Sequence, residues 1–222
     1  VIVNTTRQLL QQHNISFDGL IKQFKELSQD TDLSKLSADE LASYQELFKT
    51  IPLPAIATTF IDDESFARYR VAGPNPMLIE RIQAIPAKFA FDNQQYQQVM
   101  GEHDDLNSAL AENRIYFLDY QELSLLAEHI GQSNNGQNKY VYAPMALFAI
   151  PKGAKSIVPV AIQSGQDPTQ HPLFLQAKSH QTLSWWGWQI AKTIVQVAEG
   201  NYHELFVHLA RTHLVLEAFT IA

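Results

Sequence analysis

The sequence predicts a mainly α-helical fold that contains a small antiparallel β-sheet, and three observations support this class. Apolar side chains recur at three- and four-residue intervals within residues 1–50, as in amphipathic helices. Apolar runs rich in β-formers, separated by turn sequences, occupy the middle of the chain. A final apolar run has no Gly or Pro after Gly200, which predicts a long and largely buried helix.

Residues 1–50 are expected to form two amphipathic helices that cover a core. The second helix begins at Ser37, because Ser-Ala-Asp-Glu is a capping box. Two prolines in residues 51–56 then end the helical pattern and predict a linker or turn.

A further helix is predicted in the segment DDESFARYRVA, and it ends at the sequence Gly73-Pro74-Asn75-Pro76. A glycine followed by Pro-Asn-Pro stops a helix and favours a rigid turn. Residues 85–113 are rich in Gln, Asn, Asp and Glu, and they predict a surface region with one or two short helices.

Three strands are predicted at residues 114–120, 140–150 and 156–163, and together they would form the small antiparallel sheet. Residues 131–139 form a turn-rich loop between the first two strands, and Lys152-Gly153 marks a hairpin turn before the third. Residues 166–176 are expected to be loop.

Three tryptophans, Trp185, Trp186 and Trp188, open the helix that follows. Core packing or an apolar surface patch explains such a cluster in ordinary terms. The functional alternative is contact with a membrane or with a lipid substrate.

Three histidines, His203, His208 and His213, recur at intervals of five residues in the last apolar run. Side chains five apart on an ideal α-helix point about 140° away from each other, so a pair at this spacing cannot hold one ion. A π-helical turn, with its i→i+5 hydrogen bond, brings such a pair onto one face. The spacing therefore predicts a local π-turn.

Composition excludes several classes of function. The formal net charge of −7 argues against a general nucleic-acid surface and against electrostatic attachment to anionic lipid. The chain has no cysteine, so a metal site here must use His, Asn or carboxylate ligands. No signal peptide or membrane-spanning run is present in the sequence, and we expect a cytoplasmic or peripheral membrane location with at most a weak, apolar membrane contact.

The residues alone leave two alternatives to a redox metal site. His203-Glu204 resembles the start of the zinc-hydrolase motif HExxH, but that motif needs histidine where Val207 stands. A core helix with three hydrogen-bonded histidines and no metal is the other alternative.

The sequence WQIAK at residues 188–192, followed by HELFVHLARTHLVLEAFTIA, resembles the iron-binding helix of the lipoxygenases with its His-x4-His-x4-His signature. The Gly-Pro-Asn-Pro turn, the strand that ends in Asp-Tyr and the hairpin strand IVPVAIQ are similar to the same family, so the resemblance covers about residues 60–222. It implies that residues 1–222 are the N-terminal portion of a lipoxygenase-like helical catalytic domain, with residues 1–50 as a helical lead-in. The remainder of the domain is expected outside this chain.

The resemblance implies that His208 and His213 ligate a non-haem iron and that His203 lies in the second shell. Manganese is the alternative metal, because ligand type alone does not separate the two ions. Glu204 stands where many lipoxygenases have Gln; if ionised it could pair with His203 or lower the iron potential, and if buried it would be protonated. Glu217 is expected to be a buried hydrogen-bonding residue.

The resemblance also implies a substrate site. The family's helix before the Gly-x-Asn-Pro turn lies near the substrate entrance, which makes Phe66, Arg68, Tyr69 and Arg70 candidates for gating or for binding a carboxylate. An arginine on a solvated helix face is the ordinary alternative for each arginine. Leu209 and Leu214 each follow a predicted ligand and are candidate walls of the substrate slot.

The implied reaction is the insertion of O2 into polyunsaturated fatty acids with a cis,cis-1,4-pentadiene, giving hydroperoxides. The family uses a metal-bound hydroxide as the base, so no side chain is expected in that role. The remaining ligands would come from later sequence, and residues 1–222 alone are expected to be inactive. A lipoxygenase-like hydroperoxide isomerase and a metal-free lipid-binding helical protein are the alternatives.

Overall fold

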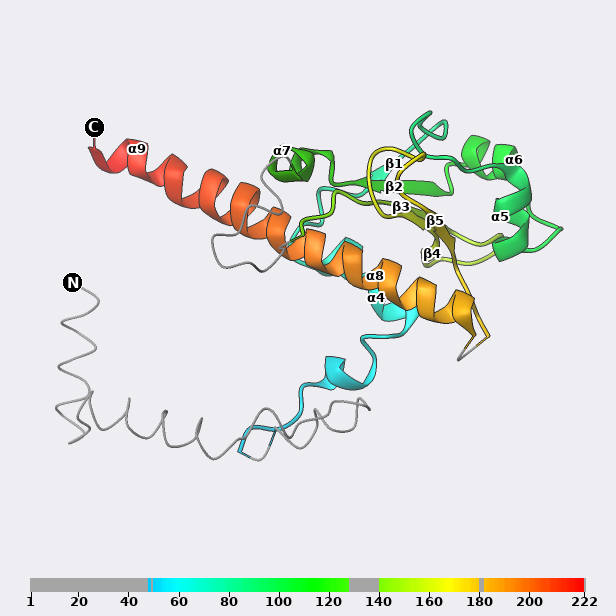
Figure 1. The fold of residues 1–222 in the computed structure, drawn as a ribbon, viewed down its shortest axis with the longest axis horizontal. Helices are drawn as coiled ribbons and strands as arrows, with labels where there is room; N and C mark the ends of the chain where they lie inside the picture. Colours follow the sequence, from blue (N-terminus) through cyan, green and yellow to red (C-terminus); the bar gives the residue numbers. More distant parts are fainter. Residues whose placement is uncertain (1–47, 49, 128–139, 180–181, 222) are drawn as a thin grey trace. The chain divides into compact units, whose positions relative to one another are not determined.

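A computed structural model describes residues 48, 50–127, 140–179 and 182–221 (Figure 1). The chain divides into two compact units, residues 1–57 and residues 58–222. A 3₁₀ helix, η2 (Ala55–Thr58), follows the two prolines that predicted a turn. The two predicted helices of residues 1–50, except for residues 48 and 50, and the predicted loop at residues 131–139 lie outside the described residues.

Five strands of the second unit form one antiparallel sheet in the order β1-β2-β3-β4-β5. The strands are β1 (Glu80–Arg81), β2 (Ile115–Asp119), β3 (Met145–Ala149), β4 (Val158–Gln163) and β5 (Leu173–Leu175). The three central strands lie within the three predicted runs but are shorter. The prediction of loop for residues 166–176 is wrong at β5, because Leu173–Leu175 pairs with the edge of β4 and is too short to show a strand pattern.

The hairpin turn predicted at Lys152-Gly153 is confirmed. It joins β3 to β4, the backbone N–H of Ala154 donates to the carbonyl of Pro151 over 2.9 Å, and Gly153 has a φ of 82°. Glycine adopts this left-handed conformation without steric cost, which explains its place in the turn.

Both faces of the sheet are buried, and alternate residues supply two separate hydrophobic clusters. On one face, Leu118, Phe148 and Ile162 pack with residues of the long C-terminal helix. On the other face, Phe117 and Leu147 pack with residues of two short helices. Such strands have continuous apolar sequences rather than an alternation of apolar and polar residues, as the sequence showed.

A bulge interrupts the pairing of β3 with β4. Leu147 pairs with Ala161 and Phe148 pairs with Pro159, so Val160 has no partner across the strands. Proline lacks a backbone N–H and is tolerated within sheets at bulges. Because of this extra residue, Val160 and Ala161 both join the same cluster although they are consecutive.

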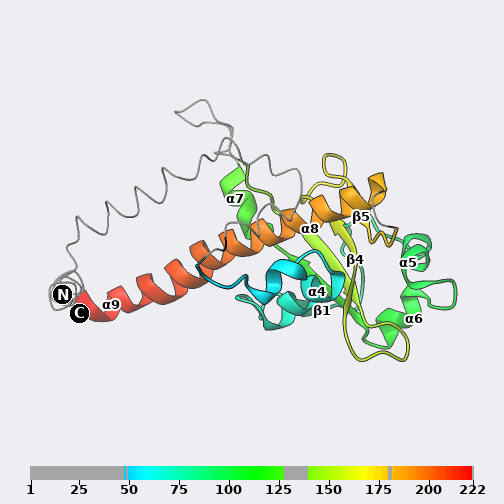
Figure 2. The ribbon, with the colours of Figure 1, turned by 90° about the horizontal axis from the view of Figure 1, so that it is seen from below.

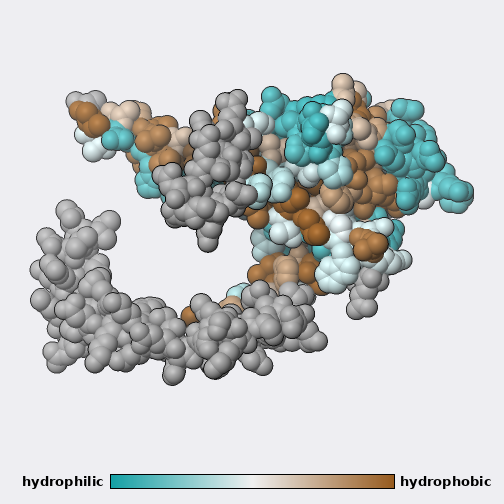
Figure 3. All heavy atoms as spheres, in the orientation of Figure 1, coloured by the Kyte–Doolittle hydropathy of each residue, from teal (hydrophilic) through white to brown (hydrophobic). Residues whose placement is uncertain are grey.

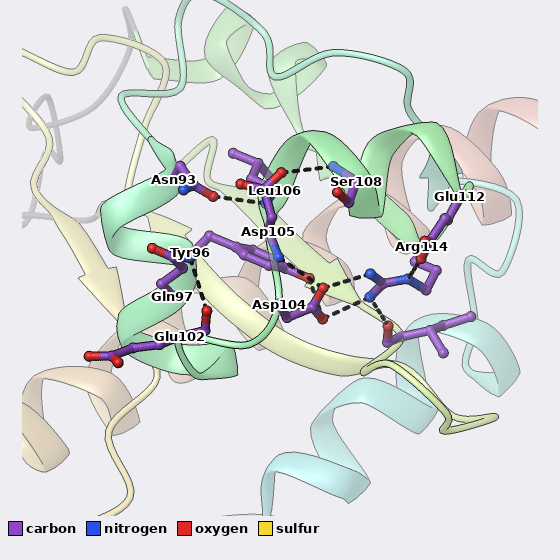
Figure 4. Close-up of polar contacts among 11 residues, drawn as sticks. Asn93, Tyr96, Gln97, Glu102, Asp104, Asp105, Leu106, Ser108, Glu112 and Arg114 are labelled. Carbon is purple, nitrogen blue, oxygen red and sulfur yellow. Dashed lines mark hydrogen bonds and ion pairs between the residues drawn. The ribbon is translucent and has the colours of Figure 1, made fainter.

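The predicted short helices of the polar segment are α5 (Asn93–Met100) and α6 (Leu106–Ala111), each capped by an aspartate. The polar cluster in Figure 4 connects these helices to the ends of the neighbouring strands. The Arg114 guanidinium contacts both carboxylate oxygens of Asp104, at 2.6 and 2.9 Å, and also donates to the carbonyl of Ile150. The Tyr96 hydroxyl donates to Asp104 over 3.1 Å. The segment therefore contributes to the buried cluster on this face of the sheet, which the surface prediction did not include.

The helix before the Gly-Pro-Asn-Pro sequence is α4 (Asp63–Ala72), and it ends at Gly73 as predicted. A Cβ atom at Gly73 would lie 2.1 Å from the backbone oxygen of Tyr69, so a side chain cannot stand there without a shift of the backbone. The turn then closes with a hydrogen bond of 3.1 Å from the N–H of Leu78 to the carbonyl of Asn75.

The long helix α8 (Leu183–Tyr202) packs on the sheet beside α4 (Figure 2). Its buried residues recur at intervals of three and four, which defines one apolar face: Trp188, Ala191, Lys192, Val195, Ala198, Glu199 and Tyr202. Asp63 joins the two helices, because its carboxylate accepts hydrogen bonds of 2.8 Å from the Lys192 amino group and from the Trp188 indole N–H. Trp188 is thus core, whereas Trp186 is 53% exposed.

A candidate metal centre on a π-helix

The three histidines lie on a π-helix, η4 (His203–Leu214), which continues α8 and leads into α9 (Val215–Ile221). The predicted π-turn is therefore confirmed, and the π geometry extends over 12 residues rather than one turn. The Thr212 hydroxyl also donates to the carbonyl of Val207 over 3.2 Å, so this side-chain hydrogen bond joins residues five apart, as the backbone bonds of a π-helix do.

The imidazoles of His208 and His213 converge. Their Nε2 atoms lie 2.9 Å apart, and the ring centroids lie 4.7 Å apart with an interplanar angle of 56°. Two imidazole nitrogens that bind one ion at about 2.1 Å, at right angles to each other, would be separated by about 3.0 Å. The separation of these two nitrogens therefore fits two adjacent ligands of a single metal ion.

Glu204 contacts His208. Its Oε2 lies 3.0 Å from Nδ1 of His208, and this hydrogen bond is the main reason why the pKa of Glu204 is lowered. Glu204 is exposed, so the alternative of a buried, protonated carboxyl is wrong, and its ion-pair contact is with His208 rather than His203. A carboxylate on Nδ1 orients an imidazole so that Nε2 faces a metal.

His203 is half-buried and has a different partner. Its Nδ1 lies 3.3 Å from Oδ1 of Asn75, and its ring is stacked on that of His208 with centroids 6.1 Å apart. It therefore lies beside the converging pair while contacting the turn after α4.

Within the described part of the chain, no group of three or more His, Cys, Asp or Glu side chains is arranged to hold a metal ion. The converging pair offers two imidazole nitrogens, and an iron site would need further ligands beside them.

No residue of η4 or α9 is buried among the described residues, so the expectation of a largely buried C-terminal helix is wrong for this chain. Leu209 and Leu214, the candidate slot walls, are 45% and 53% exposed. Glu217 is exposed rather than buried. The α8 helix packs on the sheet along one face, and η4 and α9 continue with apolar side chains open to solvent (Figure 3).

The four candidates on α4 divide into two pairs. Arg68 is exposed and Tyr69 is half-buried, whereas Phe66 and Arg70 are 2% and 1% exposed. Phe66 stacks on Phe148 with ring centroids 5.9 Å apart. The solvated-face alternative is therefore wrong for Arg70, because this side chain turns toward the core.

Arg70 belongs to a buried polar network that the sequence analysis missed. Its guanidinium donates to the Gln196 amide and, over 3.3 Å, to the Tyr120 hydroxyl, and it lies 3.7 Å from the carboxylate of Glu199. The Tyr120 hydroxyl donates to the same carboxylate. Burial is the main cause that raises the pKa of Tyr120 far above its usual value. A carboxylate in an apolar helix, four residues before His203, was the only signal of this network in the sequence.

Within the described part of the chain, no helix combines the length and the apolar character that crossing a membrane requires.

Comparison with known proteins gives a consistent family. The lipoxygenase family model matches residues 5–222. The chain is 50% identical over 186 residues to linoleate 9/13-lipoxygenase of Pseudomonas aeruginosa, covering 83% of this chain and 27% of that protein. It is 33% identical over 193 residues to the human hydroperoxide isomerase ALOXE3, covering 85% of this chain and 26% of that protein.

Solved structures show the same fold. A calcium-dependent 11R-lipoxygenase superimposes with a TM-score of 0.69 at 27% identity, covering 81% of this chain and 26% of that chain. A coral 8R-lipoxygenase gives a TM-score of 0.67 at 29% identity, covering 82% of this chain and 26% of that chain. The chain spans about a quarter of the length of these relatives. The predicted mainly α-helical, lipoxygenase-like fold with a small antiparallel sheet is confirmed, and the chain belongs to the lipoxygenase family.

Proposed function

We propose that this chain is the N-terminal portion of the catalytic domain of a non-haem iron dioxygenase that inserts O2 into polyunsaturated fatty acids. His208 and His213 are its two contributions to the iron site. The observation that carries the proposal is the 2.9 Å separation of their Nε2 atoms, on a helix that matches the family. The partners are a fatty acid with a cis,cis-1,4-pentadiene, O2, and the segment of the catalytic domain that carries the other ligands.

The residues of this chain have distinct parts in that function. His208 and His213 hold the metal, and Glu204 fixes the ring of His208 through Nδ1. Leu209 and Leu214 supply apolar surface next to the ligands, suited to the hydrocarbon chain of a fatty acid. Arg68 is exposed and Tyr69 is half-buried, so these members of the α4 group remain candidates for binding a substrate carboxylate, while Phe66 and Arg70 support the helix from within the core.

A bound iron ion would supply the one-electron chemistry by which the pentadiene loses a hydrogen atom and takes up O2. Two neutral imidazoles suit iron and also manganese, so the metal is tested by elemental analysis.

The histidine assignment predicts different effects for the three positions. In the complete enzyme, His208→Ala or His213→Ala is expected to abolish iron retention and O2 uptake with linoleate, because each removes a ligand. His203→Ala should weaken both less. His103→Ala is the matched control, since His103 is exposed in another part of the unit. Wild-type iron content in either ligand variant would exclude the assignment.

A hydroperoxide isomerase is the second candidate, favoured by the 33% identity to the human isomerase, although the identity to the linoleate lipoxygenase is 50%. It would use the same histidines on a peroxide substrate. Product analysis with linoleate under air separates the two activities. About one iron per chain in the complete protein would exclude a metal-free lipid-binding protein.

A further inference from the structure

Asn75 lies in the turn after α4 but contacts the junction at which α8 passes into the π-helix. Only 6% of its surface is exposed, and both ends of its amide reach that junction. Nδ2 donates to the backbone carbonyl of Glu199 over 3.0 Å, and Oδ1 lies 3.3 Å from Nδ1 of His203. One side chain thus bridges two helical residues that are four positions apart.

The contact with Glu199 fixes the orientation of the Asn75 amide. A carbonyl oxygen can only accept a hydrogen bond, so the NH2 group of Asn75 must face Glu199 and its oxygen must face His203. His203 must then donate through Nδ1. The imidazole is held in one orientation by a partner that lies outside the helix.

These contacts lie where the helical geometry changes. The backbone N–H of His203 is shared between the carbonyls of Glu199 and Gly200, and the wider π turns begin at this residue. The carbonyl of Glu199 therefore accepts from its own helix and from Asn75. A π-helix is less favourable than an α-helix and persists where contacts hold it, so an external anchor at its first residue sets its starting point.

The π geometry decides whether the ligands meet. His208 and His213 follow His203 at intervals of five, and if α-helical geometry extended through them their rings would point about 140° apart. We propose that Asn75 is a positioning residue that fixes this junction and thereby aims His208 and His213 at one ion. The inference rests on the proposed metal-binding function.

The groove beside Asn75 allows a positioning role in metal binding to be distinguished from a contribution to folding stability. A groove of about 410 Å³ borders Asn75 and is also lined by Tyr202 and Val207. In an Asn75→Ala variant, water in this groove can reach the freed carbonyl of Glu199. Water cannot hold the His203 ring in one orientation. Loss of Asn75 should therefore affect metal binding more than folding.

The test uses the complete enzyme as wild type, Asn75→Ala, Asn75→Asp and a control, Asn93→Ala. Asn93 is half-buried and accepts a hydrogen bond of 2.8 Å from the N–H of Leu106, far from the histidines along the fold. Iron affinity is measured by chelator competition, the iron environment by electron paramagnetic resonance of the ferric form, and folding by the Tm of the metal-free form.

Asn75→Ala is expected to weaken iron affinity about tenfold or more, as for other residues that orient metal sites, and to change the resonance line shape. Its Tm should fall no further than that of Asn93→Ala. Asn75→Asp keeps an acceptor oxygen for Nδ1 of His203 and loses only the donor to the Glu199 carbonyl, so its loss of iron affinity should be smaller than that of Asn75→Ala.

Unchanged affinity and line shape in both Asn75 variants would overturn the positioning role, as would a loss of affinity equal to that of Asn93→Ala. Either result leaves the proposed function standing if wild type holds iron and His208→Ala does not. Wild type without bound metal would remove both proposals.

Discussion

At the scale of single residues, Asp104 shows how burial and hydrogen bonding fix a charge. Its carboxylate accepts hydrogen bonds from Arg114, from the Tyr96 hydroxyl and from the backbone N–H of Asp105. The hydrogen bond from Arg114 is the main cause that lowers the pKa of Asp104. Burial, with a further contribution from Asp104, raises the pKa of Tyr96 to about 12. At neutral pH the Asp104 side chain is therefore ionised and the Tyr96 side chain is neutral.

Arg114→Met is predicted to destabilise the protein by about 3 kcal/mol, because it leaves a buried carboxylate without its charged partner. The pKa of Asp104 is lower in the folded than in the unfolded protein, so its stabilisation is present above the unfolded pKa and lost as pH falls through the folded pKa. Urea unfolding at pH 7 and pH 3 should show a smaller acid-induced loss in the variant than in wild type.

The control for this prediction is Arg81→Met, since Arg81 is exposed on the edge strand and should change stability by no more than about 0.5 kcal/mol. Equal stability of Arg114→Met and Arg81→Met would show that the Asp104 pair has no net stabilising effect.

At the scale of secondary-structure elements, two glycines differ in what surrounds them. A Cβ atom at Gly73 would meet the backbone oxygen of Tyr69 at 2.1 Å, whereas at Gly200, within α8, it would meet nothing within 4 Å. The first glycine ends α4 and begins the turn that carries Asn75. The second only lowers the helical propensity of α8.

We therefore predict opposite effects for the two alanine substitutions. Gly73→Ala should destabilise by about 1–3 kcal/mol, because the backbone must move to admit the methyl group. Gly200→Ala should stabilise by about 0.5–1 kcal/mol through the higher helix propensity of alanine. Thermal unfolding of the metal-free protein measures both, and a stabilising Gly73→Ala would refute the steric explanation.

Some helices and strands were predicted from sequence patterns and others were not. The five-residue spacing of the histidines predicted the π-turn correctly, because the geometric requirement for convergence is local. The three longer strands were predicted from their apolar runs. β1 and β5 were missed, since strands of two and three residues form only by pairing with an existing edge.

At the scale of the whole molecule, the described part of the chain has one well-packed region and one open surface. The sheet is buried on both faces, between the cluster with α8 and the cluster with α5 and α6. Apolar side chains on η4 and α9 remain exposed, including Phe219 at 78% and Ile221 at 77%. Exposed apolar surface of this kind normally marks a contact with other protein or with ligand.

Residues 1–222 produced alone are therefore predicted to retain no iron and to take up no O2 with linoleate, because two imidazoles are too few to hold the ion. The exposed helix should also bind a hydrophobic dye such as ANS more strongly than the complete enzyme does. Iron analysis of the two proteins side by side is the measurement. One equivalent of iron in the short chain would contradict the proposed division of ligands.

The sequence by itself determined the class of fold, the α4 helix with its glycine stop, the central strands and the π-turn, because each depends on interactions between near neighbours in the chain. Only the tertiary structure decided that Arg70 enters the core and that Asn75 reaches His203. These contacts join residues through packing directions that a sequence pattern does not record. Asn75 and His203 are separated by more than one hundred positions in the chain and meet because α8 lies against the turn that follows α4.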